Sequence, residues 1–319
     1  MIIDNETILV TGATGFLGSL VCEDLLNLGA NVIGIGRKES GYIGERTKGS
    51  KRFTYIRQDL ATIDLGVFKK FNICGVIHLA TPCIVDDKGN CNKDITYDDF
   101  YDVHVRATRK LIELSKQNDA RFFIFPSSVS IYGKKITVTQ ISNETCPTPA
   151  DYYGLTKYMG ERLIEIELSK VETKGIILRY PLIFGRNHPH GLIYTFYSLA
   201  AANKPISILG SGKALRSPLY IRDAVKIITK CVECLENLDK YEIISCGSSN
   251  ALSIREIAEL TVSYTNSKSR VMKADKPFSL DWDMNMDIAK LKKKLKLLPL
   301  TVEDGLRAYL KDLDIDGQF

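Results

Sequence analysis

A glycine-rich turn between a short apolar run and a helical pattern is the strongest constraint on how this 319-residue chain folds. The apolar run covers residues 7–10, and the turn places Gly12, Gly15 and Gly18 at G-x-x-G-x-x-G spacing. Apolar residues then recur at helical spacing over residues 16–28. A strand, a glycine turn and a helix in this order predict a site that cradles a pyrophosphate at the helix N-terminus.

The first half of the chain continues this alternation of strand-like and helical patterns. Strand-like runs occur at 31–35, 53–56, 75–79, 121–126 and 175–180, and helical patterns occur at 97–117 and 153–168. Such alternation predicts an α/β protein with a Rossmann-type doubly wound parallel sheet, helices on both faces and right-handed crossovers.

After residue 180 the pattern changes to glycine- and proline-containing loops around a helical stretch at 192–202. The run at 241–245 is expected to rejoin the main sheet, and a helix at 253–263 is expected to begin at Ser253 with Glu256 in a capping box. We therefore predict two interleaved units. Residues 1–180 with about 223–248 form a dinucleotide-binding domain, and 181–222 with 249–319 form a smaller C-terminal α/β substrate lobe.

Composition and charge exclude several classes of protein. The 43 Lys and Arg residues against 38 Asp and Glu leave a net charge of +5, too weak to indicate nucleic-acid binding. The chain lacks an uncharged apolar run of about 18 residues, which a membrane span needs, and its first residues lack the basic region of a signal peptide. We predict a cytoplasmic protein without nucleic-acid or membrane partners.

Two local patterns are expected to be structural. Cys231 and Cys234 form a lone C-x-x-C inside a helical stretch, and a zinc site would need a second pair of ligands. We therefore expect helix packing there and no metal site. The five lysines between residues 290 and 296 flank an apolar helical stripe and are expected to form a solvated helix face.

The residues after the second strand-like run bear on the choice of dinucleotide. NAD-binding folds usually carry an acid there, which hydrogen-bonds the ribose 2′-hydroxyl. This chain has Gly36, Arg37 and Lys38, so no acid repels a 2′-phosphate and the Arg37 guanidinium can bind one. We predict NADP(H) in preference to NAD(H), which remains an alternative. A solvated pair of basic side chains is the other interpretation.

Tyr153 and Lys157 lie one turn apart in the helical stretch 153–168, so their side chains share one face. A tyrosine phenol is too weak an acid for proton transfer near neutral pH. A neighbouring lysine cation lowers the pKa of the phenol and can also hold a cofactor ribose. The pair therefore predicts an acid–base site beside the dinucleotide.

With these motifs the chain resembles, nearly from end to end, the extended short-chain dehydrogenase/reductase family, in particular its nucleotide-sugar epimerases, dehydratases and reductases. The glycine turn and the Tyr153–Lys157 pair match the family pattern, and residues 125–133 resemble its serine-rich strand end. The resemblance implies that Ser128 holds the reacting oxygen, Tyr153 transfers the proton, and Lys157 stabilises the tyrosinate.

The motifs and the resemblance together give a set of binding residues. The residues expected to contact the cofactor are Gly12, Thr14, Gly15, Phe16, Leu17, Gly18, Arg37, Asp59, Leu60, Leu79, Ala80, Thr81, Tyr153, Lys157, Tyr180, Pro181 and Ile183. Those expected to contact a nucleotide-sugar substrate are Thr81, Ser128, Ser130, Tyr153 and Arg216. Arg216 occupies the place of a diphosphate-binding arginine, a role that suits a guanidinium. The resemblance also implies a homodimer through the helices at 97–117 and 153–168.

The serine-rich segment also bears on the type of reaction. The family's 4,6-dehydratases typically carry Thr followed by two acids, whereas this chain has Ser128, Val129 and Ser130, so dehydration is disfavoured. The main expectation is a reductase that uses NADPH on a 4-keto-6-deoxy nucleotide sugar, as in deoxysugar or polysaccharide biosynthesis. The alternative is a 4-epimerase with tightly held NAD(P). A non-catalytic NADP-binding sensor and a reductase of non-nucleotide ketones are more distant alternatives.

Three histidines depart from, or add to, this pattern. Many family members have Asn where this chain has His104, and a neutral replacement is expected, with a catalytic histidine as the alternative. His188 and His190 are expected in a surface loop, with the sugar site as the alternative location.

Overall fold

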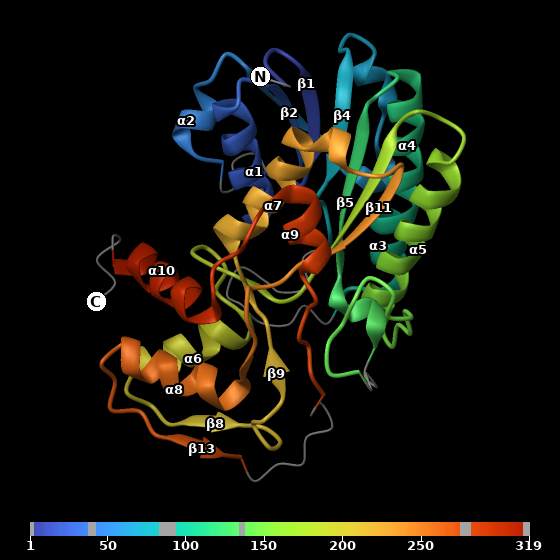
Figure 1. Ribbon diagram of the computed structural model, residues 1–319. Coiled ribbons are helices and arrows are strands. Elements are labelled where there is room, and N and C mark those ends of the chain that lie inside the picture. Colours follow the sequence, from blue (N-terminus) through green and yellow to red (C-terminus); the bar gives the residue numbers. More distant parts are fainter. Residues whose placement is uncertain (1–2, 38–42, 83–93, 134–137, 275–281, 315–319) are drawn as a thin grey trace.

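The computed structural model describes residues 3–37, 43–82, 94–133, 138–274 and 282–314 (Figure 1). Lys38 follows Arg37 in the segment that bears on the choice of cofactor, and it lies outside these ranges. No helix among the described residues is long and apolar enough to cross a membrane.

Seven parallel strands form one sheet in the order β11-β6-β5-β4-β1-β2-β3. Their bounds are β1 (Thr7–Thr11), β2 (Asn31–Gly36), β3 (Phe53–Arg57), β4 (Ile73–His78), β5 (Phe122–Ser128), β6 (Lys174–Tyr180) and β11 (Tyr241–Ser245). The predicted doubly wound sheet is confirmed, as is the return of 241–245 to it. The strand order reverses between β1 and β4, the kind of switch point at which α/β sheets bind ligands beyond the strands' carboxyl ends.

The central strands are buried along almost their whole length because both faces of the sheet are covered. All six residues of β4 are buried, as expected for a parallel strand between two helical layers. Gly75 in β4 lies against the ring of Phe122 in β5, and a β-carbon at Gly75 would overlap that ring. The glycine therefore permits a large aromatic side chain in the centre of the core.

Helices cover both faces of this sheet (Figure 1). On one face α1 (Phe16–Asn27) packs against α7 (Ile221–Glu233), and on the other α4 (Thr108–Gln117) packs against α5 (Tyr152–Leu168). The predicted helix at 97–117 begins as α3 (Tyr97–Tyr101) and reaches α4 through a π-helical segment, Asp102–Ala107. π-helical turns occur frequently at functional sites, and this one carries His104.

Among the described residues, three small sheets and three helices stand outside the main sheet, and those of their elements that Figure 1 labels lie below it. The paired strands are β7 (Ile183–Phe184) with β10 (Leu219–Tyr220), β8 (Ile206–Ile208) with β13 (Val271–Lys273), and β9 (Leu215–Arg216) with β12 (Leu252–Ser253). The helices are α6 (Gly191–Ala201), α8 (Ile254–Tyr264) and α10 (Val302–Asp314). The capping box of Ser253 and Glu256 is present as predicted. The domain ranges themselves stay a prediction.

The lysine-rich helix α9 (Ala289–Leu295) does more than present a solvated face. Lys290 and Lys294 form ion pairs with Glu242, whose side chain in β11 is fully buried. These two lysines therefore fasten α9 to the edge of the sheet. The C-x-x-C pair begins in α7 as predicted, with Cys231 buried in the core. Within the described ranges, no group of His, Cys, Asp and Glu could hold a metal ion.

A buried ion pair joins α5 to the sheet. Arg179 in β6 donates from Nη2 to Glu161 Oε2 at 2.7 Å and from Nε to Oε1 at 3.1 Å. The two side chains are 4% and 1% exposed. Arg179 Nη1 also donates to the Tyr132 hydroxyl at 2.9 Å, so the guanidinium links three segments of the core.

We predict that Arg179→Met lowers the free energy of unfolding by about 3 to 5 kcal/mol, because it leaves the Glu161 charge buried and uncompensated. Urea denaturation measures this change. The control is Arg162→Ala, which breaks an exposed pair with Glu165 and should cost at most about 1 kcal/mol. Equal losses in the two variants would contradict the role of the buried pair.

Candidate active site

The glycine turn is packed so closely that it fits a dinucleotide cradle. Gly12 has a φ of +68°, and a β-carbon there would lie 2.9 Å from the Ala80 nitrogen. A β-carbon at Gly18 would overlap the Gly12 carbonyl oxygen. No described side chain caps the N-terminus of α1, where Phe16, Leu17 and Gly18 are the first residues. Its N–H groups and dipole therefore favour an anion such as a pyrophosphate.

The strand ends next to this turn carry the residues predicted to contact the adenosine. Arg37 follows β2 and is exposed, and Arg57 Nε donates to the Arg37 carbonyl at 2.9 Å. Asp59 accepts a hydrogen bond from the Ala61 N–H at 3.0 Å and caps a short turn that begins at the buried Leu60. Arg37 thus lies where many NAD-binding folds carry an acid, and Arg57 at the end of β3 lies beside it.

Tyr55 in β3 was missed by the sequence analysis. Its pKa is raised by burial, and a hydrogen bond with the Thr14 side chain opposes that shift. A β-carbon at Gly36 would lie 2.7 Å from the Tyr55 hydroxyl and 2.8 Å from Thr14 Oγ1. Tyr55 therefore packs against Thr14 and Gly36, at the end of the cradle where the adenosine is expected. A lone tyrosine in a strand gives no sequence signal for this role.

The structure brings Ser128, Tyr153 and Lys157 together at the carboxyl end of β5. Helix α5 starts there because Asp151 Oδ1 accepts from the Gly154 N–H at 2.8 Å. Ser128 and Ser130 lie side by side, with their hydroxyl oxygens 3.2 Å apart. Burial raises the pKa of Tyr153, and a hydrogen bond with Ser128 opposes the rise. In the protein without ligands the phenol is therefore neutral and able to donate a proton.

Lys157 is buried beneath this tyrosine, with 3% of its surface exposed. Its Nζ donates to the Pro126 carbonyl at 2.9 Å and lies 4.6 Å from the centre of the Phe125 ring and 6.0 Å from that of Tyr153. Burial lowers the pKa of Lys157 to about 7, and the Glu161 carboxylate counteracts this shift. The amine is thus poised to change its charge near neutral pH.

The segment after β4 forms the opposite wall. His78 accepts at Nδ1 from Thr11 Oγ1 at 2.6 Å and donates from Nε2 to the Val103 carbonyl at 3.1 Å. Thr11 Oγ1 in turn accepts from the Ala80 N–H at 3.2 Å. His78, not identified from the sequence, therefore holds the Leu79–Ala80–Thr81 segment against β1. Thr81 itself is exposed.

The remaining residues predicted to bind cofactor or substrate are buried, half-buried or hydrogen-bonded within the protein. Tyr180 uses its hydroxyl to donate to the Ala224 carbonyl at 2.8 Å, so this hydroxyl is engaged in packing. Pro181 is buried and Ile183 is half-buried. Arg216 in β9 is half-buried and donates from Nη1 to the carbonyls of Leu215 and Trp282. Its diphosphate-binding role stays a prediction.

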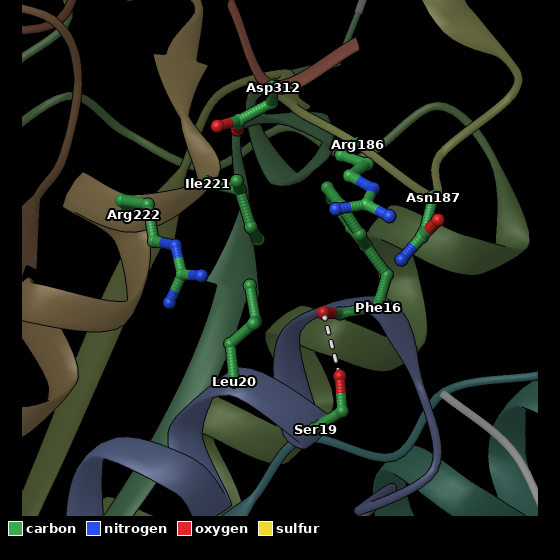
Figure 2. Close-up of a pocket in the computed structure, with 8 residues that line it drawn as sticks. All are labelled: Phe16, Ser19, Leu20, Arg186, Asn187, Ile221, Arg222 and Asp312. Atoms are coloured by element: carbon green, nitrogen blue, oxygen red, sulfur yellow. Dashed lines mark hydrogen bonds between the residues drawn. The ribbon is translucent and has the colours of Figure 1, made fainter. Parts of the chain in front are cut away.

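A small cavity of about 130 Å³ opens beside the glycine turn (Figure 2). Figure 2 shows Arg186 and Asn187 on one side, with Arg222 facing them across Ile221 and Leu20. The expected surface loop at 185–190 therefore packs onto the start of α1. There the His188 ring stacks on Phe16, with centroids 4.3 Å apart and planes 5° apart. This contact joins the loop to the dinucleotide turn.

Comparisons with known proteins agree with this geometry. Residues 8–247 match the model of the family described as "NAD dependent epimerase/dehydratase family". An uncharacterized UDP-glucose epimerase of Bacillus subtilis is 30% identical, over 96% of this chain and 98% of its own. The dTDP-4-dehydro-6-deoxyglucose reductase of Escherichia coli is 24% identical, over 96% and 97%. The UDP-glucuronic acid 4-epimerase of Bacillus cereus, solved with UDP-glucuronic acid and NAD, is 27% identical over 96% and 99%, with a TM-score of 0.78.

We predict that the buried amine of Lys157 makes stability depend on pH. Its pKa falls from 10.5 to about 7 on folding, so between these pH values the unfolded chain binds a proton that the folded chain has released. Stability therefore rises with pH in this window. Relative to Lys157→Met, the free energy of unfolding of the wild type should increase by about 1 kcal/mol for each pH unit above pH 8.

Urea unfolding at pH 7, 8 and 9 measures this difference in the absence of cofactor. Lys69→Met, at an exposed position, is the control for effects of pH on the whole chain. A difference between wild type and Lys157→Met that does not change with pH would contradict the prediction.

Proposed function

The chain belongs to the NAD-dependent epimerase/dehydratase family and is an NAD(P)-dependent enzyme that modifies nucleotide sugars, and we propose that its reaction is 4-epimerisation with a cofactor retained between turnovers. This reverses the order of the two expectations from the sequence, which put a reductase first. The comparisons support the epimerase better, since the relatives found include two named as 4-epimerases and one named as a UDP-glucose epimerase, against one dedicated reductase and one trifunctional enzyme with a reductase activity.

The observation that carries the proposal is the cluster of Ser128, Tyr153 and Lys157 beside the glycine turn. The dinucleotide, when bound, supplies reversible hydride transfer at C4 of the sugar. Tyr153 takes the proton of the 4-hydroxyl and later returns it, while the Ser128 hydroxyl holds the same oxygen. In its protonated form Lys157, whose Nζ lies 6.0 Å from the centre of the Tyr153 ring, stabilises the tyrosinate. The same three groups act on the 4-oxygen whichever face of the sugar ring exchanges the hydride.

The reductase remains a second candidate because of Arg37. Its exposed guanidinium suits the 2′-phosphate of NADPH, the usual consumable reductant. The deciding experiment incubates the purified protein, without added cofactor, with UDP-glucose or UDP-glucuronic acid and separates the products. Interconversion with the 4-epimer supports the proposal. Stoichiometric oxidation of NADPH by a 4-keto-6-deoxy nucleotide sugar, with no interconversion, would establish the reductase instead.

We predict that Tyr153→Phe lowers kcat by about 10²- to 10⁴-fold, because the ring keeps its packing but loses the proton that it transfers. The dissociation constant of the dinucleotide should change by less than about threefold, since the glycine turn is untouched. Kinetics and equilibrium binding measure the two effects separately. Turnover within tenfold of the wild type would refute the role of Tyr153.

We also propose that the chain binds NADP(H) more tightly than NAD(H), although NAD occupies the related structures. Arg37→Ala should raise the dissociation constant of NADP+ by about 10- to 100-fold, because a charge-assisted hydrogen bond is lost, and should leave that of NAD+ unchanged. Arg52→Ala, at the opposite end of β3, is the control. Tighter binding of NAD+ than of NADP+ by the wild type would contradict this preference.

Two further expectations stay proposals. Arg216 is proposed to bind the substrate diphosphate after it exchanges its carbonyl partners for phosphate oxygens. A homodimer is proposed through α3, α4 and α5. It is supported by the apolar surface that α5 exposes at Tyr152, Leu155 and Ile166, which are 60%, 38% and 62% exposed. A cytoplasmic location stays a prediction from the sequence.

A further inference from the structure

A relay of three hydrogen-bonded side chains runs from the exposed Thr81 into the core behind Tyr153. Thr81 Oγ1 lies 2.9 Å from His104 Nε2, and His104 Nδ1 lies 2.9 Å from Thr156 Oγ1. His104 and Thr156 are completely buried, whereas Thr81 is exposed. The His104 ring lies between Phe100 and Tyr153, with centroids 5.8 Å and 5.6 Å away.

The direction of each hydrogen bond between these side chains can be assigned by starting at the buried Thr156. Thr156 donates its only hydroxyl proton to the Tyr152 carbonyl at 2.8 Å, as threonines often do within helices. Thr156 Oγ1 must then accept from His104, which places the imidazole proton on Nδ1. Nε2 of the neutral ring is therefore an acceptor, and Thr81 must donate to it.

The electrostatic surroundings keep the ring neutral, as this assignment requires. Burial holds the pKa of His104 well below its ordinary value, and the nearby Lys157 and His78 lower it further. A protonated ring would offer two N–H donors, and Thr81 could no longer donate to Nε2.

We infer that His104 and Thr156 fix the Thr81 hydroxyl as a donor to His104 Nε2. Thr81 can then only accept a hydrogen bond from its ligand, and it therefore selects a sugar hydroxyl. His104 is thus a positioning residue and Thr81 is a specificity-determining one. The inference rests on the proposed function, because the hydroxyl belongs either to the hexose of the substrate or to the nicotinamide ribose. A ligand group that can only accept would face an unpaired oxygen, and such mismatches are costly in a closed site.

The test compares ligands that can donate at one position with analogues that cannot. The hexose arm uses UDP-glucose and its 2-, 3- and 4-deoxyfluoro analogues with the protein loaded with the reduced dinucleotide, which cannot accept a hydride from the sugar. The ribose arm uses NAD+ and its analogue with fluorine in place of a nicotinamide-ribose hydroxyl. Dissociation constants are measured by calorimetry, without turnover.

Three variants interrupt this series of hydrogen bonds at different points. Thr81→Val removes the acceptor, and His104→Phe keeps the ring packing but removes both nitrogens. Thr156→Val keeps both Thr81 and His104 and removes only the oxygen that fixes the tautomer. One of the analogues carries fluorine at the hydroxyl that Thr81 contacts. The wild type should bind the natural ligand about 3- to 10-fold more tightly than this analogue. This ratio should fall to about 1 in Thr81→Val and decrease in the other two variants.

The ratio separates positioning from a merely structural role, since a structural defect weakens the hydroxyl and fluoro ligands alike. Discrimination in the hexose arm assigns the hydroxyl to the substrate, and discrimination in the ribose arm assigns it to the cofactor. Ratios unchanged from the wild type in Thr81→Val, which replaces an exposed side chain and should fold, would overturn the inference. Failure of UDP-glucose to bind would count against the proposed function, and the ribose arm would then decide the inference alone.

Discussion

The burial of the Lys157 amine is the constraint on which the active site depends. An ammonium group is costly to remove from water, and the protein offsets that cost with the Pro126 carbonyl, the Phe125 ring and the Glu161 carboxylate. Glu161 is in turn neutralised by Arg179. Charges thus alternate along α5 and into β6. The pKa of Lys157 reflects this whole arrangement, so the chemistry of the site is tied to how α5 packs on the sheet.

The opposite wall is built from neutral groups. His78 and His104 are both buried, and their pKa values are held low by burial and by the lysine charge. Each ring therefore serves as a fixed donor–acceptor bridge. His78 joins Thr11 in β1 to the Val103 carbonyl. His104 joins Thr81, after β4, to Thr156 in α5. The π-helical turn brings both contacts about, since it supplies the Val103 carbonyl and the His104 ring. On this side, the Lys157 cation thus faces imidazole rings that stay uncharged.

Sequence patterns predicted the elements whose periodicity is strong. The glycine turn, the strand alternation and the capping box of Ser253 and Glu256 follow from local rules, and the structure has them. Contacts between distant segments could not be predicted in the same way. One extra residue in a π-helical turn barely disturbs a helical pattern, and nothing local marks Glu242 as the buried partner of two lysines. Tyr55 and His78 gain their roles only when parallel strands align their carboxyl ends.

The stacking of His188 on Phe16 bears on how this sequence can change over evolutionary time. The two rings lie almost parallel, and a β-carbon at Gly185 would lie 3.4 Å from Cζ of the same phenyl group. Loss of either aromatic ring would expose the other and loosen the loop that follows β7. We therefore expect positions 16 and 188 to vary together among close homologues, even though the glycine motif itself places no requirement on a residue so far along the chain.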